Sequence, residues 1–354
     1  MEQQNRLMKK AALFGSLFIV AAMGIMLYYS AHKVIVVTDV AQDEVDWKAS
    51  EDSTAITDKN HIVFERENKQ HSKYFRIPLP EDVKAEDVTI ENHYVNRELL
   101  VCMIPKERNG QEQFYESHAV SGNCEKVLDG QIEVEQERIG LRFTLTDVYE
   151  YQSAYEDNAL YIEFVQPKEV YDKIVVIDPA YGGEETGPVA GNADSKTIML
   201  NVAKALKTKL DDTDIKVYYT RMDDTDPDSA ERVGLANTTG ADILIRLEVN
   251  TSKETQTYGT EAVYNARFFI PGFGNVELAD LIEREVVTAI GGKANGLTPA
   301  GEEDEILQKA TVPAATIRVG YLSNEKERAL LLQEDYARRI AEGIYQAILK
   351  VYEE

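Results

Sequence analysis

The chain has 354 residues, more than one typical domain, so two folded units with accessory segments are expected. Hydrophobic residues make up 44% of it, which is enough to build real cores. The formal net charge is −24 at pH 7, and so acidic a surface repels phosphate backbones, which argues against nucleic-acid binding. A cationic or neutral partner is expected instead.

The first recognisable element is an uncharged apolar stretch near the N-terminus. Residues 11–29 carry no charged side chain, and these 19 positions are close to the roughly 20 that a helix needs to cross a bilayer. We therefore expect a transmembrane anchor over residues 11–30. A cleaved signal peptide and a buried core helix are the alternatives, but Tyr29 stands where a cleavage site needs a small residue.

The charges that flank this stretch predict its orientation. Arg6, Lys9 and Lys10 precede it, and mostly acidic residues follow it. By the positive-inside rule, residues 1–10 lie in the cytoplasm and the rest of the chain lies outside the membrane. Residues 31–58 are polar and acidic with little periodicity, as expected of a tether.

Residues 59–168 predict a small β-rich module. Short alternating runs such as HIVFER, ELLVCMI and ALYIEFV have the period of half-buried strands. Both cysteines of the chain, Cys102 and Cys124, lie here, in a compartment that permits disulfides. A bond between them would add ~3 kcal/mol of stability. Two thiols are the alternative.

Residues 172–354 alternate between apolar strands and helical patterns. KIVVID, IKVYYT, ADILIRLEV and AATIRVGYL predict strands, and SKTIMLNVAKALKTKL and EDYARRIAEGIYQAILKVY predict helices. This order is typical of an α/β fold with a mostly parallel sheet and helices on both faces. Sites in such folds form at the carboxyl ends of the strands.

Several stretches of this half, in order, are similar to the zinc-dependent N-acetylmuramoyl-L-alanine amidases of bacterial cell-wall metabolism. They include KIVVIDPAYGG, ERVGLANTTGADILIRLEVNTS and VPAATIRVGYLSNEKE. The resemblance implies the amidase fold, zinc as cofactor, and peptidoglycan as substrate.

Four positions depart from the pattern that the resemblance implies. The family has histidines where this chain has Tyr181 and Glu248, and glutamates where it has Ser195 and Arg318. The residue at 318 corresponds to the catalytic glutamate. All four differ together, so no catalytic residue, no bound metal and no zinc cofactor are expected.

The residue types alone lead to the same expectation. A catalytic zinc needs about three protein donors and an open position, but no histidine follows His118 and the last half has no cysteine. Asp178, Glu184, Glu185 and Glu248 could form a hard-cation site instead. A permanent charge on Arg318 argues against it, because two unit charges ~4 Å apart repel by ~4 kcal/mol at an effective dielectric near 20.

The same arginine predicts what takes the place of the metal. If Glu248 and Arg318 end neighbouring strands, they form an ion pair, with Arg246 on the strand face of Glu248. The alternative is that Glu248 and Arg318 both point to solvent.

Other residues near these strand ends are candidates for binding or for support of the turn. Tyr181 is expected to pack over the turn of Gly182 and Gly183 or to contact a ligand. Asp178 is expected to anchor the turn by hydrogen bonds, and Arg221 to orient nearby carboxylates.

Phe268, Phe269 and Phe273 surround a proline–glycine turn. If exposed, they form a surface for a partner or a glycan; otherwise they fold into the core.

These observations together predict a membrane-anchored, extracytoplasmic cell-wall protein with an inactive amidase fold. It would bind peptidoglycan, a muropeptide or a cell-envelope protein. An active amidase that cleaves the MurNAc to L-Ala bond with a non-standard metal site is one alternative. A structural assembly protein that recognises partners through its β module is another.

Overall fold

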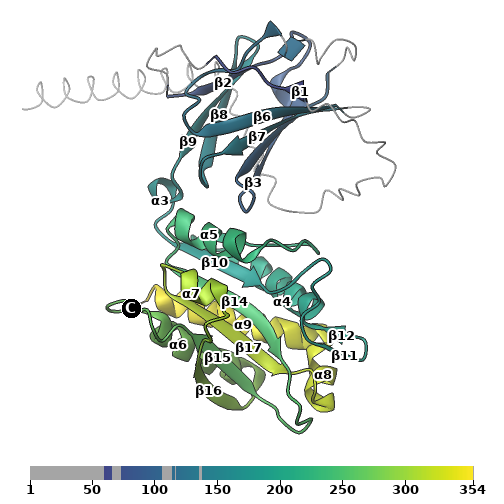
Figure 1. Ribbon diagram of the computed structural model, residues 1–354, viewed down its shortest axis with the longest axis vertical. Coiled ribbons are helices and arrows are strands. Elements are labelled where there is room, and N and C mark those ends of the chain that lie inside the picture. Colours follow the sequence, from purple (N-terminus) through teal and green to yellow (C-terminus); the bar gives the residue numbers. More distant parts are fainter. Residues whose placement is uncertain (1–59, 66–72, 106–113, 116, 135–137, 354) are drawn as a thin grey trace, which may run out of the picture. The chain divides into compact units, whose positions relative to one another are not determined.

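The computed structural model describes residues 60–65, 73–105, 114–115, 117–134 and 138–353 (Figure 1). The expected transmembrane anchor, 11–30, and the tether, 31–58, lie outside these residues. Within the described ranges no helix is long and apolar enough to span a bilayer. The chain forms two compact units. Among the described residues, unit 1 draws on the ranges 60–92, 99–144 and 151–164, and unit 2 on 93–98, 145–150 and 165–353.

The described part of the segment before residue 166 folds into two sheets. The five-stranded sheet has the order β1 (Asn60–His61), β6 (Val127–Val134), β7 (Ile139–Leu145), β4 (Glu98–Met103) and β3 (Val88–His93). The four-stranded sheet has the order β5 (Ser121–Gly122), β2 (Phe75–Pro78), β9 (Ala159–Val165) and β8 (Glu150–Glu156). The short 3-10 helix η1 (Ala85–Asp87) precedes β3.

The core of unit 1 contains a pair of buried aromatic rings, Phe75 and Phe143, which meet edge to face with 5.1 Å between the ring centroids. Cys102 in β4 and Cys124 after β5 are both buried. A disulfide between Cys102 and Cys124 stays a prediction.

Unit 2 is built on a six-stranded sheet with an α/β architecture. Its order is β13 (Lys216–Tyr219), β10 (Ile174–Pro179), β14 (Ile243–Asn250), β17 (Ala314–Tyr321), β15 (Thr260–Tyr264) and β16 (Ala294–Pro299). The first four strands are parallel to one another. β15 runs antiparallel to β17, and β16 is parallel to β15. The sheet is therefore mostly parallel, as expected, with two reversed strands at one edge.

Helices cover both faces of this sheet (Figure 1). One face packs against α4 (Ser195–Leu210), α6 (Asn275–Ile290) and α9 (Glu334–Val351). The other packs against α5 (Ser229–Thr239) and α7 (Glu305–Lys309). The shorter elements are α3 (Pro167–Val170), α8 (Glu325–Leu331) and the hairpin of β11 (Val189–Ala190) and β12 (Ala193–Asp194).

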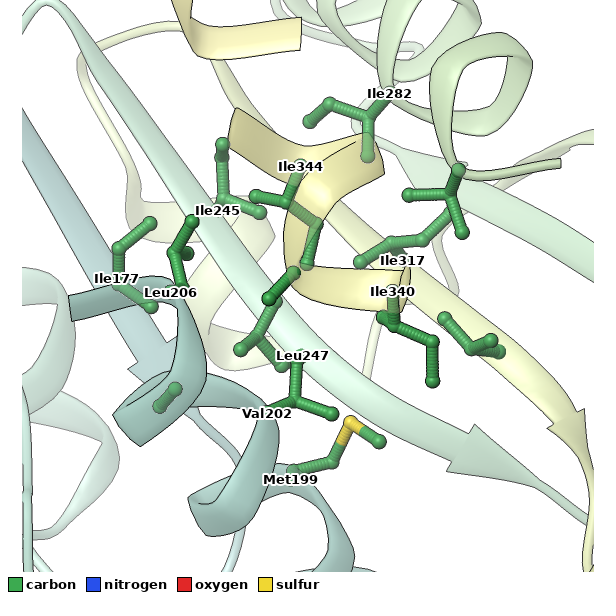
Figure 2. Packing of buried hydrophobic residues seen from close by; sticks show 14 of the residues in the cluster. Ile177, Met199, Val202, Leu206, Ile245, Leu247, Ile282, Ile317, Ile340 and Ile344 are labelled. Atoms are coloured by element: carbon green, nitrogen blue, oxygen red, sulfur yellow. The ribbon is translucent and has the colours of Figure 1, made fainter. Parts of the chain in front are cut away.

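Figure 2 shows the larger core, where strand residues meet three helices. The strands contribute branched side chains such as Ile177, Ile245, Leu247 and Ile317, and the helices contribute Met199, Val202, Leu206, Ile282, Ile340 and Ile344. Because side chains alternate along a strand, the residues between these face the opposite side of the sheet. On β14 those residues are Arg246 and Glu248, close to the carboxyl end of the strand.

Candidate functional site

Three arginines and four acids alternate in a row along the carboxyl ends of β10, β14 and β17. We call this set the ion-pair row; its members in spatial order are Asp226, Arg232, Asp178, Arg246, Glu248, Arg318 and Glu261. Asp178 on β10 stands opposite Arg246 on the neighbouring parallel strand β14. In the same way, Glu248 on β14 stands opposite Arg318 on β17. The register of the sheet therefore brings these side chains together.

Asp178, the last acid of β10, is fully buried. Its carboxylate accepts hydrogen bonds from the Thr220 hydroxyl at 2.6 Å, from Arg232 Nη1 at 2.6 Å, and from Arg246 Nη1. The expectation that Asp178 anchors the glycine turn is wrong, because its partners are these cations and Thr220. Arg232 anchors the turn instead, donating to the carbonyls of Pro179 and Tyr181 at 3.0 Å each.

Arg232 is a site residue that sequence reasoning missed. It lies one turn into α5, whose start is fixed by a capping box: Asp228 accepts from the Glu231 N–H, and Glu231 from the Asp228 N–H, at 2.8 Å each. This motif, DSAE, is visible in the sequence and could have placed the arginine at the first turn. Which strand end it reaches depends on tertiary packing.

Glu248 lies between two guanidinium groups. Its Oε1 accepts from Arg246 Nε and its Oε2 from Arg318 Nε, each at 2.9 Å. The expected Glu248–Arg318 ion pair is confirmed, and Glu248 is only 8% exposed rather than directed to solvent. Arg318 also lies 3.5 Å from Glu261, which accepts a shorter bond of 2.7 Å from Asn250.

The arginines keep both buried carboxylates ionised. Burial on its own raises the pKa of Asp178, but Arg246 and Arg232 outweigh it, so this pKa lies below its ordinary value. Burial likewise acts to raise the pKa of Glu248, and Arg246 with Arg318 lowers it overall. In return, Asp178 and Glu248 raise the pKa of Arg246, against the effect of its burial.

Tyr181 covers the row from the loop after β10. Its backbone has φ of +64°, in the left-handed region that few residues other than glycine adopt. Its ring lies 5.9 Å from the Arg246 guanidinium carbon and packs on Gly187, where a Cβ would come within 2.4 Å of the ring. Burial, followed by the charge of Glu248, raises the pKa of its hydroxyl. Tyr181 thus packs as expected, but over Gly187.

Gly182 and Gly183 both have positive φ, which confirms that they serve the turn. Ser195 is fully buried at the start of α4, where its hydroxyl accepts the Val249 N–H at 3.2 Å and so fixes the end of β14 to the helix. Arg221 is 3% exposed and donates to four backbone carbonyls, so the expectation that it orients carboxylates is wrong.

The carboxylates proposed as a hard-cation site do not come together. Among the described residues, no three His, Cys, Asp or Glu side chains are grouped so that they could hold a metal ion. Glu184 and Glu185 are exposed, and Glu185 accepts the Gly187 N–H at 3.2 Å.

The three phenylalanines around the proline–glycine turn differ in their exposure to solvent. Phe269 is 82% exposed and Phe268 42%, whereas Phe273 packs against the larger core. The three rings therefore do not form one exposed surface.

Residues 175–350 match the family model described as N-acetylmuramoyl-L-alanine amidase. The C-terminal domain of this chain belongs to the N-acetylmuramoyl-L-alanine amidase family. It is 27% identical over 186 residues to the amidase CwlM of Mycobacterium tuberculosis, a match that covers 51% of this chain and 45% of that protein. It is 28% identical over 202 residues to the germination-specific amidase of Bacillus subtilis, covering 51% and 81%.

A solved N-acetylmuramoyl-L-alanine amidase from Clostridium difficile 630 is 30% identical to this amidase-family domain. That comparison covers 51% of this chain and 97% of the other, with a TM-score of 0.48. The chain spans less than half of the length of the mycobacterial relative.

Proposed function

We propose that this chain is a membrane-anchored, extracytoplasmic cell-wall protein whose amidase-family domain binds without hydrolysing. Its ligand would be peptidoglycan, a muropeptide or a cell-envelope partner. The observation that carries this proposal is the position of Glu248 between Arg246 and Arg318, with both carboxylate oxygens occupied by guanidinium N–H groups.

The residues at this place do not fit the zinc that the family resemblance implies. A catalytic zinc takes three electron-pair donors and keeps one position open for water. Here Tyr181, Ser195, Glu248 and Arg318 stand at the four relevant positions, and no histidine follows His118 in the sequence. A guanidinium has no electron pair to offer and cannot deprotonate in a protein. A divalent ion at Glu248 would also meet the repulsion of both arginines.

The cell-wall assignment rests on the family of the domain, since the relatives are named as N-acetylmuramoyl-L-alanine amidases. The assignment to the outer side of the membrane rests on the uncharged stretch 11–29 and the basic residues that precede it.

The test uses the full-length protein purified in detergent. We expect no stoichiometric zinc by elemental analysis after incubation with excess zinc, no release of stem peptide from muropeptides, and retention on insoluble cell-wall sacculi. Zinc near one equivalent together with release of stem peptide would show an active amidase with a non-standard site. Absence of retention on sacculi would exclude intact peptidoglycan and leave a muropeptide or a cell-envelope partner as the ligand.

A further inference from the structure

A groove lies between α4 and the beginning of α9 in unit 2, with a cavity volume of about 640 Å³. Ligand sites in proteins usually enclose about 300–1,000 Å³, so this groove is large enough to hold side chains of a partner. Its lining residues come from the β11–β12 hairpin, from α4, and from the segment 331–338 that joins α8 to α9. On α4 they include Thr197, Asn201, Ala205 and Thr208, whose spacing of three or four residues places them on one face of the helix.

The groove belongs to the helical layer that covers the face of the sheet opposite to the ion-pair row. Ile245 and Leu247 of β14 lie in the core that α4 and α9 share with the sheet. Arg246 and Glu248 alternate with them along the strand and face the other side. A ligand in this groove would therefore occupy a surface apart from the one on which the proposed function rests.

The bottom of the groove is apolar and its side chains are short or branched. Ile198, Leu331 and Ala337 line it and are buried as part of the larger core, and Ala205 packs against that core from α4. Leu332, at the end of α8, also lines the groove but is 48% exposed. Because the distance between packed helices depends on the side chains at the contact, the two alanines allow a third helix to approach closely.

The two sides of the groove restrict the kind of chain that fits between them. Both sides are helices, α4 and α9, whose interior backbone groups are bonded within each helix. An extended peptide would find no strand edge to pair with, so its own backbone groups would stay unpaired on entering the groove. A helix brings its backbone hydrogen bonds with it. Among the described residues that line the groove, none is an aromatic residue on which a sugar ring could stack.

The groove has a local excess of positive charge, although the formal net charge of the chain is −24. α4 contains four lysines and no acid. The charged residues that line the groove are three cations and two acids: Lys204, Lys209, Arg338, Asp194 and Glu334. Asp194 caps α4, since its carboxylate accepts the Thr197 N–H at 2.8 Å. Acidic side chains of a partner therefore complement this groove.

The ion pairs that two of these cations make do not exclude such a partner. Lys209 pairs with Glu342 and Arg338 with Glu334, and the four side chains are between 33% and 82% exposed. Surface pairs of this kind contribute about 0–1 kcal/mol, so a second carboxylate can share the same cations at little cost. Charges farther away than about 8–10 Å are screened at physiological ionic strength. The local charge of the groove thus outweighs the acidic remainder of the chain.

We infer that this groove binds an amphipathic helix of a second protein. The helix carries apolar side chains at positions i, i+3 or i+4, and i+7, which contact Ala205, Leu332 and Ala337. Aspartate or glutamate side chains flank these positions and lie beside Lys204 and Arg338. This interaction surface goes beyond the proposed function and does not depend on it.

The test is a selection of displayed random peptides of about 18 residues, which is five helical turns. The full-length protein is held in lipid nanodiscs, and peptides that bind empty nanodiscs are removed first. Enriched peptides are sequenced and synthesised, and their affinities are measured by fluorescence anisotropy. We expect them to have apolar residues at helical spacing and a net negative charge.

Two variants of the groove show where the selected peptides bind. Asn201→Trp places a large ring in the groove from an exposed position of α4 and should weaken binding about 10-fold or more. Lys204→Glu reverses a charge at the groove and should weaken binding about 5-fold. The matched controls are Ala230→Trp, exposed on α5 at the other face of the sheet, and Lys253→Glu, exposed in the loop after β14. Both controls should bind as the unchanged protein does, and melting temperatures of all four variants separate loss of binding from loss of folding.

Four results would each overturn the inference. The first is that no peptide is enriched over empty nanodiscs, and the second is that the enriched peptides show no helical spacing. The third is that they bind folded Asn201→Trp and Lys204→Glu as tightly as the two controls. The fourth is that replacing their acids with lysine leaves the affinity unchanged. Zinc content and retention on sacculi do not enter these measurements, so failure of the proposed function remains distinguishable from failure of this inference.

Discussion

Arg246 and Glu248 lie two residues apart on β14 and form an ion pair of 2.9 Å on one face of the sheet. The same arginine also binds Asp178 on β10, while the same glutamate binds Arg318 on β17. The pair therefore joins three strand ends. Its members are 12% and 10% exposed in their side chains, so each depends on the other for charge compensation.

Replacing Arg246 by methionine should destabilise unit 2 strongly. The change removes the central cation and leaves two buried carboxylates with one guanidinium each, which costs about 3–5 kcal/mol for a broken buried pair. Chemical denaturation followed by circular dichroism measures this loss. Arg338→Met removes an exposed arginine paired with Glu334 and should cost no more than about 1 kcal/mol. Similar losses in the two variants would mean that the row contributes little to stability.

The contribution of Asp178 should disappear in acid. Its pKa in the folded protein is lowered from 3.8, so the stability it provides is complete above its unfolded pKa and is lost as pH falls through the folded pKa. We expect Asp178→Asn to be several kcal/mol less stable than the unchanged protein at pH 7. This difference should shrink below about pH 4. Denaturation curves between pH 7 and pH 3 measure it.

Asp212→Asn, in the exposed turn after α4, is the control for the acid series. Its free energy of unfolding at pH 7 should differ little from that of the unchanged protein, because the side chain is exposed. A constant difference for Asp178→Asn over the same range would contradict the assignment of an ionised carboxylate to the row.

Gly187→Ala should displace the Tyr181 ring. Gly187 and Gly191 both have φ of +63°, but a Cβ at Gly187 meets the ring at 2.4 Å, while nothing lies within 4 Å of one at Gly191. The left-handed backbone should therefore lower the free energy of unfolding of both alanine variants by about 1 kcal/mol. In Gly187→Ala alone, the overlap with the ring should lower it by about 1–3 kcal/mol more. Thermal denaturation of both variants measures the difference.

If the overlap is the cause, adding Tyr181→Ala should relieve most of the excess cost of Gly187→Ala and none of the cost of Gly191→Ala. No relief in the first double variant would show that the two residues are not in contact.

Restoring the ligands that the family resemblance implies should not suffice for zinc binding. A variant with Tyr181→His, Ser195→Glu, Glu248→His and Arg318→Glu still carries Arg246, whose guanidinium has then lost Glu248 and remains beside the new donors. We expect it to take up well under one equivalent of zinc, because a fixed cation repels the metal.

Adding Arg246→Leu to these four changes should raise zinc uptake toward one equivalent. Elemental analysis of both variants after gel filtration makes the comparison. Full zinc occupancy while Arg246 is still present would show that this arginine is no obstacle.

The sequence was informative where local pattern determines structure. Alternation of strands and helices predicts the α/β sheet, and the placement of Glu248 and Arg318 at strand ends predicts their pairing, because parallel neighbours share an edge. The antiparallel direction of β15 was not anticipated. Only residues 251–259 separate it from β14, with no helix in between, which is the signal that a right-handed crossover is absent.

Contacts that depend on packing between distant elements could not be predicted. The pairing of Arg232 with Asp178 requires α5 to lie over the end of β10, and periodicity does not fix that position. Arg221 was misjudged for the same reason, since its four carbonyl partners come from the end of β10, the loop after β13 and the first turn of α4. Phe269 and Phe273 lie in the same turn, and the sequence pattern does not indicate which of them faces the core. In the structure Phe273 packs against the core and Phe269 is exposed.

The cations that hold the ends of β10, β14 and β17 together are arginine side chains, which are part of the polypeptide itself. Under the proposed function, we expect this domain to fold without taking up an ion from the surroundings, equally well in cells starved of transition metals and in cells amply supplied with them. A chelator added to the purified protein would leave its melting temperature where it was.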